Sequence, residues 1–199
     1  MMLELYPEIE PFHSEWLSRE QLDENNQHEI YVEQCGNPDG IPVLFLHGGP
    51  GSGCRPGHRR FFDPARYHII LFDQRGCGRS KPNGELRHND LPHLIQDIEA
   101  IRDHLKISKW MLFGGSWGAT LALAYARDHS KNVISMILRG TFLGRREDID
   151  WVYGAGGASK IFADGWHDLQ QLVPAGANLL DSYFQLLQDD SAETRQQGG

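Results

Sequence analysis

Short apolar runs recur along the first 140 residues of the chain, at spacings that suit the strands of one sheet. In His28–Gln34, isoleucine and valine alternate with polar neighbours, which is typical of a half-buried strand. Four later runs are almost entirely apolar, as strands in the middle of a sheet are: Pro42–Leu46, Tyr67–Phe72, Trp110–Phe113 and Val133–Leu138. The turn-forming residues of Gly36–Gly40 predict a hairpin connection between the first two of these strands.

Helical patterns lie between the apolar runs. From Asp90 to Leu105, apolar residues recur at steps of three and four, and Asn89 or Asp90 is suited to cap this helix. Trp117–His129 is rich in alanine and leucine, which are good helix formers. Strands that alternate with helices predict an α/β fold, with a mainly parallel sheet, helices on both faces and an antiparallel N-terminal hairpin at one edge.

The pattern changes at about residue 141. Residues 1–140 are expected to form the N-terminal part of the α/β core. Beyond them the apolar strand-like runs stop, and short helical patterns such as Ile161–Trp166 and Ala177–Leu187 alternate with breaks that contain glycine and aspartate. Residues 141–199 are therefore expected to begin a separate helical segment.

Composition narrows the class of protein. The 199 residues are 40% hydrophobic and 23% charged, so widespread disorder is not expected. Asp and Glu outnumber Lys and Arg by 27 to 19, which argues against a nucleic-acid partner. No window approaches the roughly 18 consecutive apolar residues of a membrane-spanning helix, and glutamates interrupt the N-terminal stretch where a signal peptide would be apolar. Three scattered cysteines favour reduced thiols, and hence a cytoplasmic protein.

The strongest candidate for chemistry is Gly114–Gly118, a GxSxG pattern centred on Ser116. An apolar strand precedes it and an alanine-rich and leucine-rich helix follows it. A sharp strand-to-helix turn of this kind lifts a serine hydroxyl above the edge of the sheet. The N-terminus of the helix also supplies free N–H groups to a developing oxyanion. Ser116 is therefore predicted to be a nucleophile, against the alternative of an ordinary glycine-rich turn.

A second glycine-rich loop, His47–Gly53, directly follows another apolar strand. In a serine hydrolase such a loop supplies the second N–H group of the oxyanion hole. A phosphate-binding loop is the rival, but Cys54-Arg55 stands where a Walker sequence needs Lys followed by Ser or Thr. His47 precedes the serine, so a structural role is favoured over that of a general base. The Gly49–Pro50 bond is a candidate for a cis peptide.

The third motif, Asp73–Ser80, also follows an apolar strand. Its aspartate and two arginines can stabilise the loop by charge-assisted hydrogen bonds, so a scaffolding role beside the active-site mouth is predicted. Cys77 is weighed as a second nucleophile and disfavoured, because no base accompanies it. The ten histidines form no cluster with metal-ligand spacing, so no metal site is predicted.

In their order and spacing, three segments resemble the prolyl aminopeptidases, also called proline iminopeptidases. The segments are HEIYVEQCGNPDGIPVLFLHGGPGSG, LFDQRGCGRSKP and LFGGSWGATLALAYA, and the likeness runs from about His28 to at least Tyr153. These enzymes are α/β-hydrolases of the serine-peptidase type that remove an N-terminal proline from peptides. The resemblance implies an α/β-hydrolase core followed by the start of a helical cap, and it implies no cofactor.

The resemblance also implies roles for particular residues. Ser116 matches the nucleophile of the family, and the N–H groups of Trp117 and Gly49 match its oxyanion hole, with Gly48 as the alternative to Gly49. Phe142 matches a residue that lines the pocket for the proline ring. The expected substrate is a peptide with an N-terminal proline, with no nucleic-acid or membrane partner.

The acid and base of a catalytic triad are expected beyond residue 199, together with the carboxylates that bind the substrate amine. In this fold they follow the serine in the order Asp, then His. After Ser116 only His129 and His167 remain, and neither follows a late core strand. The 199 residues are therefore expected to be the N-terminal portion of such an enzyme, almost inactive alone. The alternatives are an esterase or other small-molecule hydrolase on the same fold, and an inactive fragment that acts as a binding module.

Overall fold

The computed structural model describes residues 4–198. These residues divide into two compact units, with the division between Leu143 and Gly144. The first unit contains the sheet and the glycine-rich loops, and it carries all the residues with predicted catalytic roles. The second unit is described separately below.

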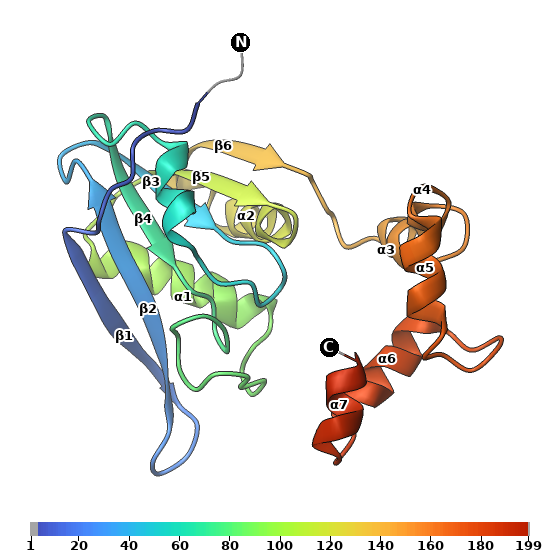
Figure 1. Ribbon diagram of the computed structural model, residues 1–199. Coiled ribbons are helices and arrows are strands. Elements are labelled where there is room, and N and C mark those ends of the chain that lie inside the picture. Colours follow the sequence, from blue (N-terminus) through green and yellow to red (C-terminus); the bar gives the residue numbers. More distant parts are fainter. Residues whose placement is uncertain (1–3, 199) are drawn as a thin grey trace. The chain divides into compact units, whose positions relative to one another are not determined.

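A six-stranded sheet forms the first unit, in the order β1-β2-β4-β3-β5-β6 (Figure 1). Its strands are β1 (His13–Gln21), β2 (Gln27–Gly36), β3 (Ile41–Leu46), β4 (Tyr67–Phe72), β5 (Trp110–Gly115) and β6 (Val133–Arg139). β1 and β2 are antiparallel, as are β2 and β4, whereas β4, β3, β5 and β6 pair in parallel. The predicted α/β class, with a mainly parallel sheet, is confirmed.

The N-terminal hairpin exists, but its partners differ from those predicted. β2 pairs with β1, through a turn at residues 22–26, and not with β3. The prediction of a hairpin at Gly36–Gly40 was wrong, because β4 lies between β2 and β3. β3 runs parallel to β4 and β5, so the turn at Gly36–Gly40 connects two strands that are not neighbours.

Two helices cover one face of this sheet, α1 (Leu91–His104) and α2 (Trp117–Asp128). Their apolar residues pack against alternate residues of β2, β3, β4 and β5, as the period of two in a strand requires. The largest fully buried side chains there include Trp110 and Tyr125. Asp90 caps α1, as predicted, by accepting a hydrogen bond from the His93 N–H.

The opposite face carries a smaller apolar cluster. It comprises Cys35, Val43, Phe45, Phe62, Ile69 and Leu71. A single short 3-10 helix, η1 (Pro56–Phe61), lies on this side, and its Phe61 stacks on Phe45 with ring centroids 6.0 Å apart. A second 3-10 helix, η2 (Ser130–Asn132), connects α2 to β6. The two apolar clusters thus cover both faces of the sheet, and the loops that follow β3 and β5 leave its edge between them.

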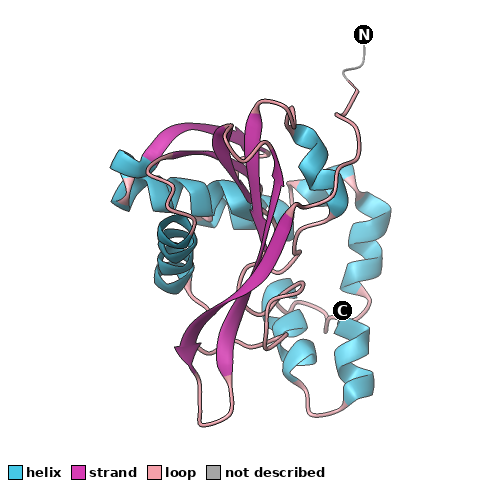
Figure 2. Cartoon of the chain, turned by 90° about the vertical axis from the view of Figure 1, so that its left-hand side faces the viewer, coloured by secondary structure: helices cyan, strands magenta, loops and turns pink. Residues whose placement is uncertain are grey.

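The second unit contains helices and no strand among its described residues (Figure 2). They are α3 (Arg146–Tyr153), α4 (Ala158–Ile161), α5 (Ala163–Gln170), α6 (Leu179–Gln188) and α7 (Ala192–Gly198). Asn178 caps α6 by accepting a hydrogen bond from the Asp181 N–H. The helical patterns expected after residue 141 correspond to α5 and α6, whereas α3, α4 and α7 were not predicted individually.

Gly118 allows α2 to lie against β3, and we expect Gly118→Ala to destabilise the first unit. A Cβ atom at Gly118 would lie 2.1 Å from the backbone oxygen of Leu46, which cannot move aside without distorting β3. Overpacking of this kind typically costs about 1–3 kcal/mol. Gly57→Ala is the matched control, because a Cβ there meets nothing within 4 Å. Chemical denaturation measures the difference, and equal stabilities for the two variants would contradict the close packing.

Candidate active site

Ser116 occupies the sharp turn between β5 and α2. Its backbone adopts φ 55° and ψ −122°, a left-handed conformation that is uncommon for a residue with a side chain. The Ser116 N–H donates to the Arg139 carbonyl oxygen at 3.1 Å, which ties the turn to β6. The Ser116 side chain is exposed and lines a cavity of about 500 Å³. This is the geometry that presents a hydroxyl group to a ligand.

Glycines on both sides make this turn possible. A Cβ at Gly114 would lie 2.3 Å from the Gly118 carbonyl oxygen, so the two arms of the turn approach more closely than side chains allow. α2 begins at Trp117, and the first N–H groups of a helix have no partner within it. The Trp117 N–H is therefore available beside Ser116.

The loop after β3 lies next to this turn because β3 and β5 are neighbours. Leu46 is paired with Gly114, so both strands end at the same level. A Cβ at Gly48 would lie 3.1 Å from the Gly115 carbonyl oxygen and 3.5 Å from the Ser116 Cβ. The Gly49–Pro50 peptide is cis, as the sequence suggested. Two N–H-bearing segments thus meet at Ser116.

His47 is buried beneath this loop and not directed at the serine as a base. Its Nδ1 lies 2.9 Å from the Gly48 carbonyl oxygen, and its Nε2 accepts a hydrogen bond from the Gln74 N–H at 3.0 Å. A carbonyl oxygen can only accept, so Nδ1 carries the proton and the imidazole is neutral. Both ring nitrogens are therefore committed to the backbone, in agreement with the structural role favoured for this residue.

We expect acid to destabilise the first unit partly through His47. Burial lowers the pKa of His47, and the hydrogen bond to Gly48 and the charge of Asp73 oppose this only in part. A lowered folded-state pKa contributes stability that is complete above the unfolded value of about 6.5 and is lost as the pH falls through the folded value. The melting temperature should therefore fall between about pH 7 and pH 5.

The contribution of His47 can be separated by substitution. His47→Gln should flatten this part of the pH profile, because glutamine does not titrate. His13→Gln is the control, since the His13 side chain is 52% exposed on β1 and should leave the slope unchanged. If the melting temperatures of the two variants depended on pH in the same way, His47 would not be a source of the acid sensitivity.

Asp73 connects the two loops behind the site. Its carboxylate accepts hydrogen bonds from the Cys54 N–H at 2.6 Å and from the Arg79 N–H and Nε at 2.8 Å. Burial alone would raise the pKa of Asp73, but the hydrogen bonds from Arg79 and Cys54 outweigh it and lower the pKa. Arg79 also donates to the buried Glu33 at 2.8 Å. The predicted scaffolding role of this motif agrees with these contacts.

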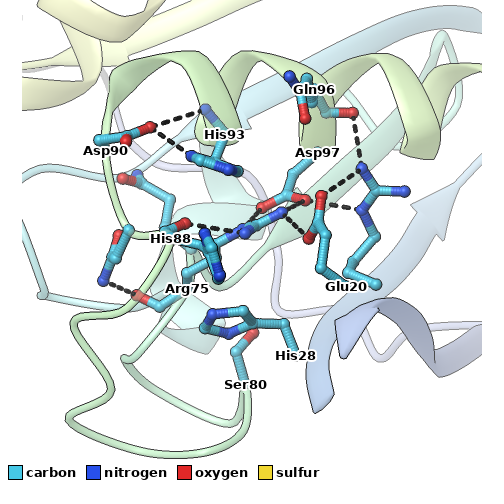
Figure 3. Close-up of polar contacts among 12 residues, drawn as sticks. Glu20, His28, Arg75, Ser80, His88, Asp90, His93, Gln96 and Asp97 are labelled. Atoms are coloured by element: carbon cyan, nitrogen blue, oxygen red, sulfur yellow. Dashed lines mark hydrogen bonds and ion pairs between the residues drawn. The ribbon is translucent and has the colours of Figure 1, made fainter. Parts of the chain in front are cut away.

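Arg75 anchors the same loop from the other side, as Figure 3 shows. Its guanidinium forms an ion pair with Asp97 of α1, with an Nη2–Oδ1 distance of 2.7 Å, and neither side chain is exposed. The Arg75 Nη1 also donates to the His88 carbonyl oxygen at 2.8 Å, and Arg19 of β1 donates to Asp97 at 2.8 Å. The loop after β4 is thus fixed to both α1 and β1.

Basic residues dominate the charged part of the cavity around Ser116. Its lining consists of Phe45, Leu46, His47, Gly48, Gly49, Ser52, Gly53, Arg55, His58, Gly115, Ser116, Arg139 and Gly140. Within the described residues, Phe142 does not belong to this lining. Its carbonyl oxygen accepts a hydrogen bond from the Thr120 hydroxyl of α2. The sequence did not point to Arg55, His58 and Arg139: Arg55 and His58 lie at the start of η1, and Arg139 is the last residue of β6.

His58 is the second histidine in the lining, and it is not set up as a base either. Its Nδ1 accepts a hydrogen bond from the Arg55 N–H at 3.1 Å, so the neutral ring carries its proton on Nε2. His129 lies at the far end of α2 from Ser116, stacked on Tyr125 and 3.5 Å from Glu99. The described residues of the first unit, 4–143, thus bring no histidine to Ser116 as a proton acceptor.

The disfavoured alternatives gain no support from the structure. Among residues 4–198 no group of three or more His, Cys, Asp or Glu side chains could hold a metal ion. His28 is buried, and its Nε2 lies 2.9 Å from the Arg87 carbonyl oxygen. Burial raises the pKa of the Cys77 thiol to about 11, which leaves it protonated and unreactive at neutral pH. No described helix is long and apolar enough to cross a membrane.

The fold and the serine turn define a class of protein, and comparison with known families gives the same class. Residues 41–191 match the model of the alpha/beta hydrolase fold, so the chain belongs to the α/β-hydrolase family. The proline iminopeptidase of Arabidopsis thaliana is 49% identical over 192 residues, which cover 95% of this chain and 49% of that protein. The proline iminopeptidase of Xanthomonas citri is 48% identical, over 98% of this chain and 61% of that protein.

A solved structure agrees in fold. A proline iminopeptidase-related protein of Thermus thermophilus superposes with a TM-score of 0.58 at 23% identity, over 92% of this chain and 59% of that one. The chain thus spans about half to three fifths of the length of these relatives. The resemblance found in the sequence is borne out by the family match and by the two proline iminopeptidases at 48% and 49% identity.

Proposed function

We propose that this chain carries the nucleophile and oxyanion hole of a serine aminopeptidase that releases an N-terminal proline from peptides. The observation that carries the proposal is the turn at Ser116. Its hydroxyl lines a cavity, and the Trp117 N–H and the Gly48–Gly49 backbone lie beside it. The similarity to proline iminopeptidases supports the choice of substrate.

The proposed chemistry is acyl transfer in two steps. The Ser116 Oγ attacks the carbonyl carbon of the N-terminal residue, and the N–H groups of Trp117 and Gly49 stabilise the negative oxygen. The C–N bond of the peptide then breaks, and the shortened peptide leaves as an amine that takes up a proton. Water attacks the ester on Ser116 and releases the amino acid. No metal or organic cofactor takes part.

Proton transfer and recognition of the amine are not assigned to the residues that line this cavity. His47 and His58 each accept a backbone hydrogen bond, so neither is the base. The lining of the cavity contains no carboxylate that could pair with a secondary ammonium group. From the similarity to proline iminopeptidases, the triad acid and base and the amine-binding carboxylates are proposed to lie beyond residue 199, and Phe142 is proposed to line the proline pocket once the substrate is bound.

Substrate preference tests the proposal. The complete gene product that carries these 199 residues is assayed with a prolyl arylamide, an alanyl arylamide and a simple aryl ester. Faster turnover of the prolyl arylamide than of its alanyl counterpart is the expected result. Turnover of the ester alone would overturn the peptidase assignment and favour a small-molecule hydrolase. Failure of a fluorophosphonate to label Ser116 in that well-folded product would favour a binding module.

A further inference from the structure

Gln74, in the loop after β4, contacts both segments that supply the proposed oxyanion hole. Its Nε2 donates to the His47 carbonyl oxygen at 3.0 Å, and its Oε1 accepts from the Trp117 indole N–H at 2.9 Å. Its backbone N–H donates to the His47 ring at 3.0 Å. The residue is 3% exposed, so these hydrogen bonds are shielded from water. One side chain therefore joins the start of the loop after β3 to the first residue of α2.

The chemistry of an amide is matched to this position. One end must donate, because a carbonyl oxygen can only accept, and the other must accept, because an indole nitrogen can only donate. Glutamate of the same shape has no donor for the His47 carbonyl oxygen when ionised. Methionine of similar size retains neither hydrogen bond. Among side chains of this length, only glutamine can both donate to the His47 carbonyl oxygen and accept from the Trp117 indole.

The backbone of Gln74 is itself fixed on both sides. Asp73 is held by Arg79 and the Cys54 N–H, and Arg75 is held by Asp97. A side chain that extends from so rigid a backbone can fix the positions of its two partners. Gln74 is not part of the lining around Ser116, so within the described residues it acts from behind the two segments.

We propose that Gln74 is a positioning residue that sets the separation between the two N–H donors of the oxyanion hole. The donor at Gly49 is placed through His47, two residues earlier, and the donor at Trp117 is placed through its indole ring. This inference rests on the proposed acyl transfer at Ser116. Displacement of a reacting group by about 1 Å can cost about 100-fold in rate. Loss of the amide should therefore lower kcat more than it changes KM.

The test compares Gln74→Met with Gln34→Met in the complete gene product. Gln34 is a partly buried glutamine of β2 whose Oε1 is 3.0 Å from the His68 Nε2, so its substitution also removes a side-chain hydrogen bond but touches neither segment. Gln74→Met should lower kcat for the prolyl arylamide by about 10- to 100-fold with KM changed less than about twofold. Gln34→Met should retain the wild-type kcat.

Melting temperatures separate positioning from loss of structure. If Gln74→Met keeps the wild-type kcat, or if both variants lose kcat in proportion to their stability, the proposal is overturned. A second variant, Trp117→Phe, removes the indole N–H from this arrangement together with part of the ring. Combining it with Gln74→Met should cost little more than Gln74→Met alone, because both interrupt the same connection, whereas independent losses that multiply would contradict the proposal.

The test of the Gln74 proposal can be read separately from the test of substrate class. Substrate class is read from the wild-type protein alone, whereas Gln74 is judged by the ratio of variant to wild type on whichever arylamide or ester is turned over. The rate at which a fluorophosphonate labels Ser116 gives the same ratio without any substrate. Wild-type protein that turns over only esters would overturn the peptidase assignment and leave the Gln74 ratio measurable. No labelling and no turnover by folded wild-type protein would overturn both.

Discussion

Ser116→Ala is expected to lower kcat for the prolyl arylamide by about 10⁴- to 10⁶-fold in the complete gene product, and to abolish labelling by a fluorophosphonate. The reason is that the Ser116 Oγ is the atom that forms the bond to the substrate carbonyl in the proposed reaction. The fold should persist, because the side chain is exposed and makes no capping hydrogen bond to α2. The residual rate reflects binding and the oxyanion hole.

Ser135→Ala is the matched control for this loss. Ser135 is an exposed serine of β6, the strand to which the Ser116 turn is hydrogen bonded, and it does not line the cavity. Both variants should melt at the wild-type temperature, and only the Ser116 variant should lose activity and labelling. Substantial turnover by Ser116→Ala, or label found at another residue, would remove the nucleophile assignment.

Asp97→Ala is expected to lower the free energy of unfolding by about 3–5 kcal/mol, which is the usual cost of removing one partner of a buried ion pair. Neither Asp97 nor Arg75 has any exposed side-chain surface, so water cannot replace the lost carboxylate. The Arg19 guanidinium also loses its hydrogen bond to Asp97, and Glu20 is the carboxylate that remains beside both arginines. This is a large fraction of the stability of a typical domain.

An exposed ion pair provides the comparison. Arg146 and Asp150 are 2.8 Å apart on α3, with side chains 79% and 55% exposed. Asp150→Ala should cost less than about 0.5 kcal/mol, because water screens such pairs. Urea denaturation measures both losses. A loss below about 1 kcal/mol for Asp97→Ala would show that the Arg75 guanidinium finds water or another partner when the carboxylate is removed.

Local sequence patterns were enough to predict most elements near the serine turn. β4 has the predicted limits, Tyr67–Phe72, because it is apolar except for His68 and is bounded by polar residues. The helix predicted from Asp90 to Leu105 is α1, because capping by Asp90 and the spacing of its leucines and isoleucines agree. The turn at Ser116 follows from the adjacent glycines, which are needed wherever the backbone approaches itself closely.

Pairing between distant segments could not be predicted in the same way. β1 was missed because Trp16 and Leu17 are consecutive and interrupt the alternation of apolar and polar residues. Its pairing with β2 makes the true hairpin, whereas the stronger turn signal at Gly36–Gly40 connects β2 to a strand that lies beyond β4. Turn-forming residues indicate where the chain reverses, but they do not specify which strands become neighbours.

Gln74, the proposed positioning residue, and Arg139 of the cavity lining were missed for a similar reason. Nothing in the sequence around Gln74 distinguishes a buried amide from a solvated one, and its partners are 27 and 43 positions away along the chain. Arg139 lines the cavity only because β6 ends beside β5, a fact of sheet register. Spacing along the chain predicted the turn at Ser116, whereas the residues that support this turn depend on tertiary contacts.

The division of the chain after Leu143 has a consequence for protein engineering. Ser116, Trp117, Gly49, His47 and Gln74 all belong to the first compact unit, as do the hydrogen bonds that join them. Segments from relatives with other preferences could therefore be grafted in place of the helices that follow, without changing the residues of the proposed nucleophile turn and oxyanion hole. Chimaeras made in this way would differ in the helical unit and share the proposed nucleophile and oxyanion hole. Their substrate preferences would therefore show how far the helical unit determines substrate choice.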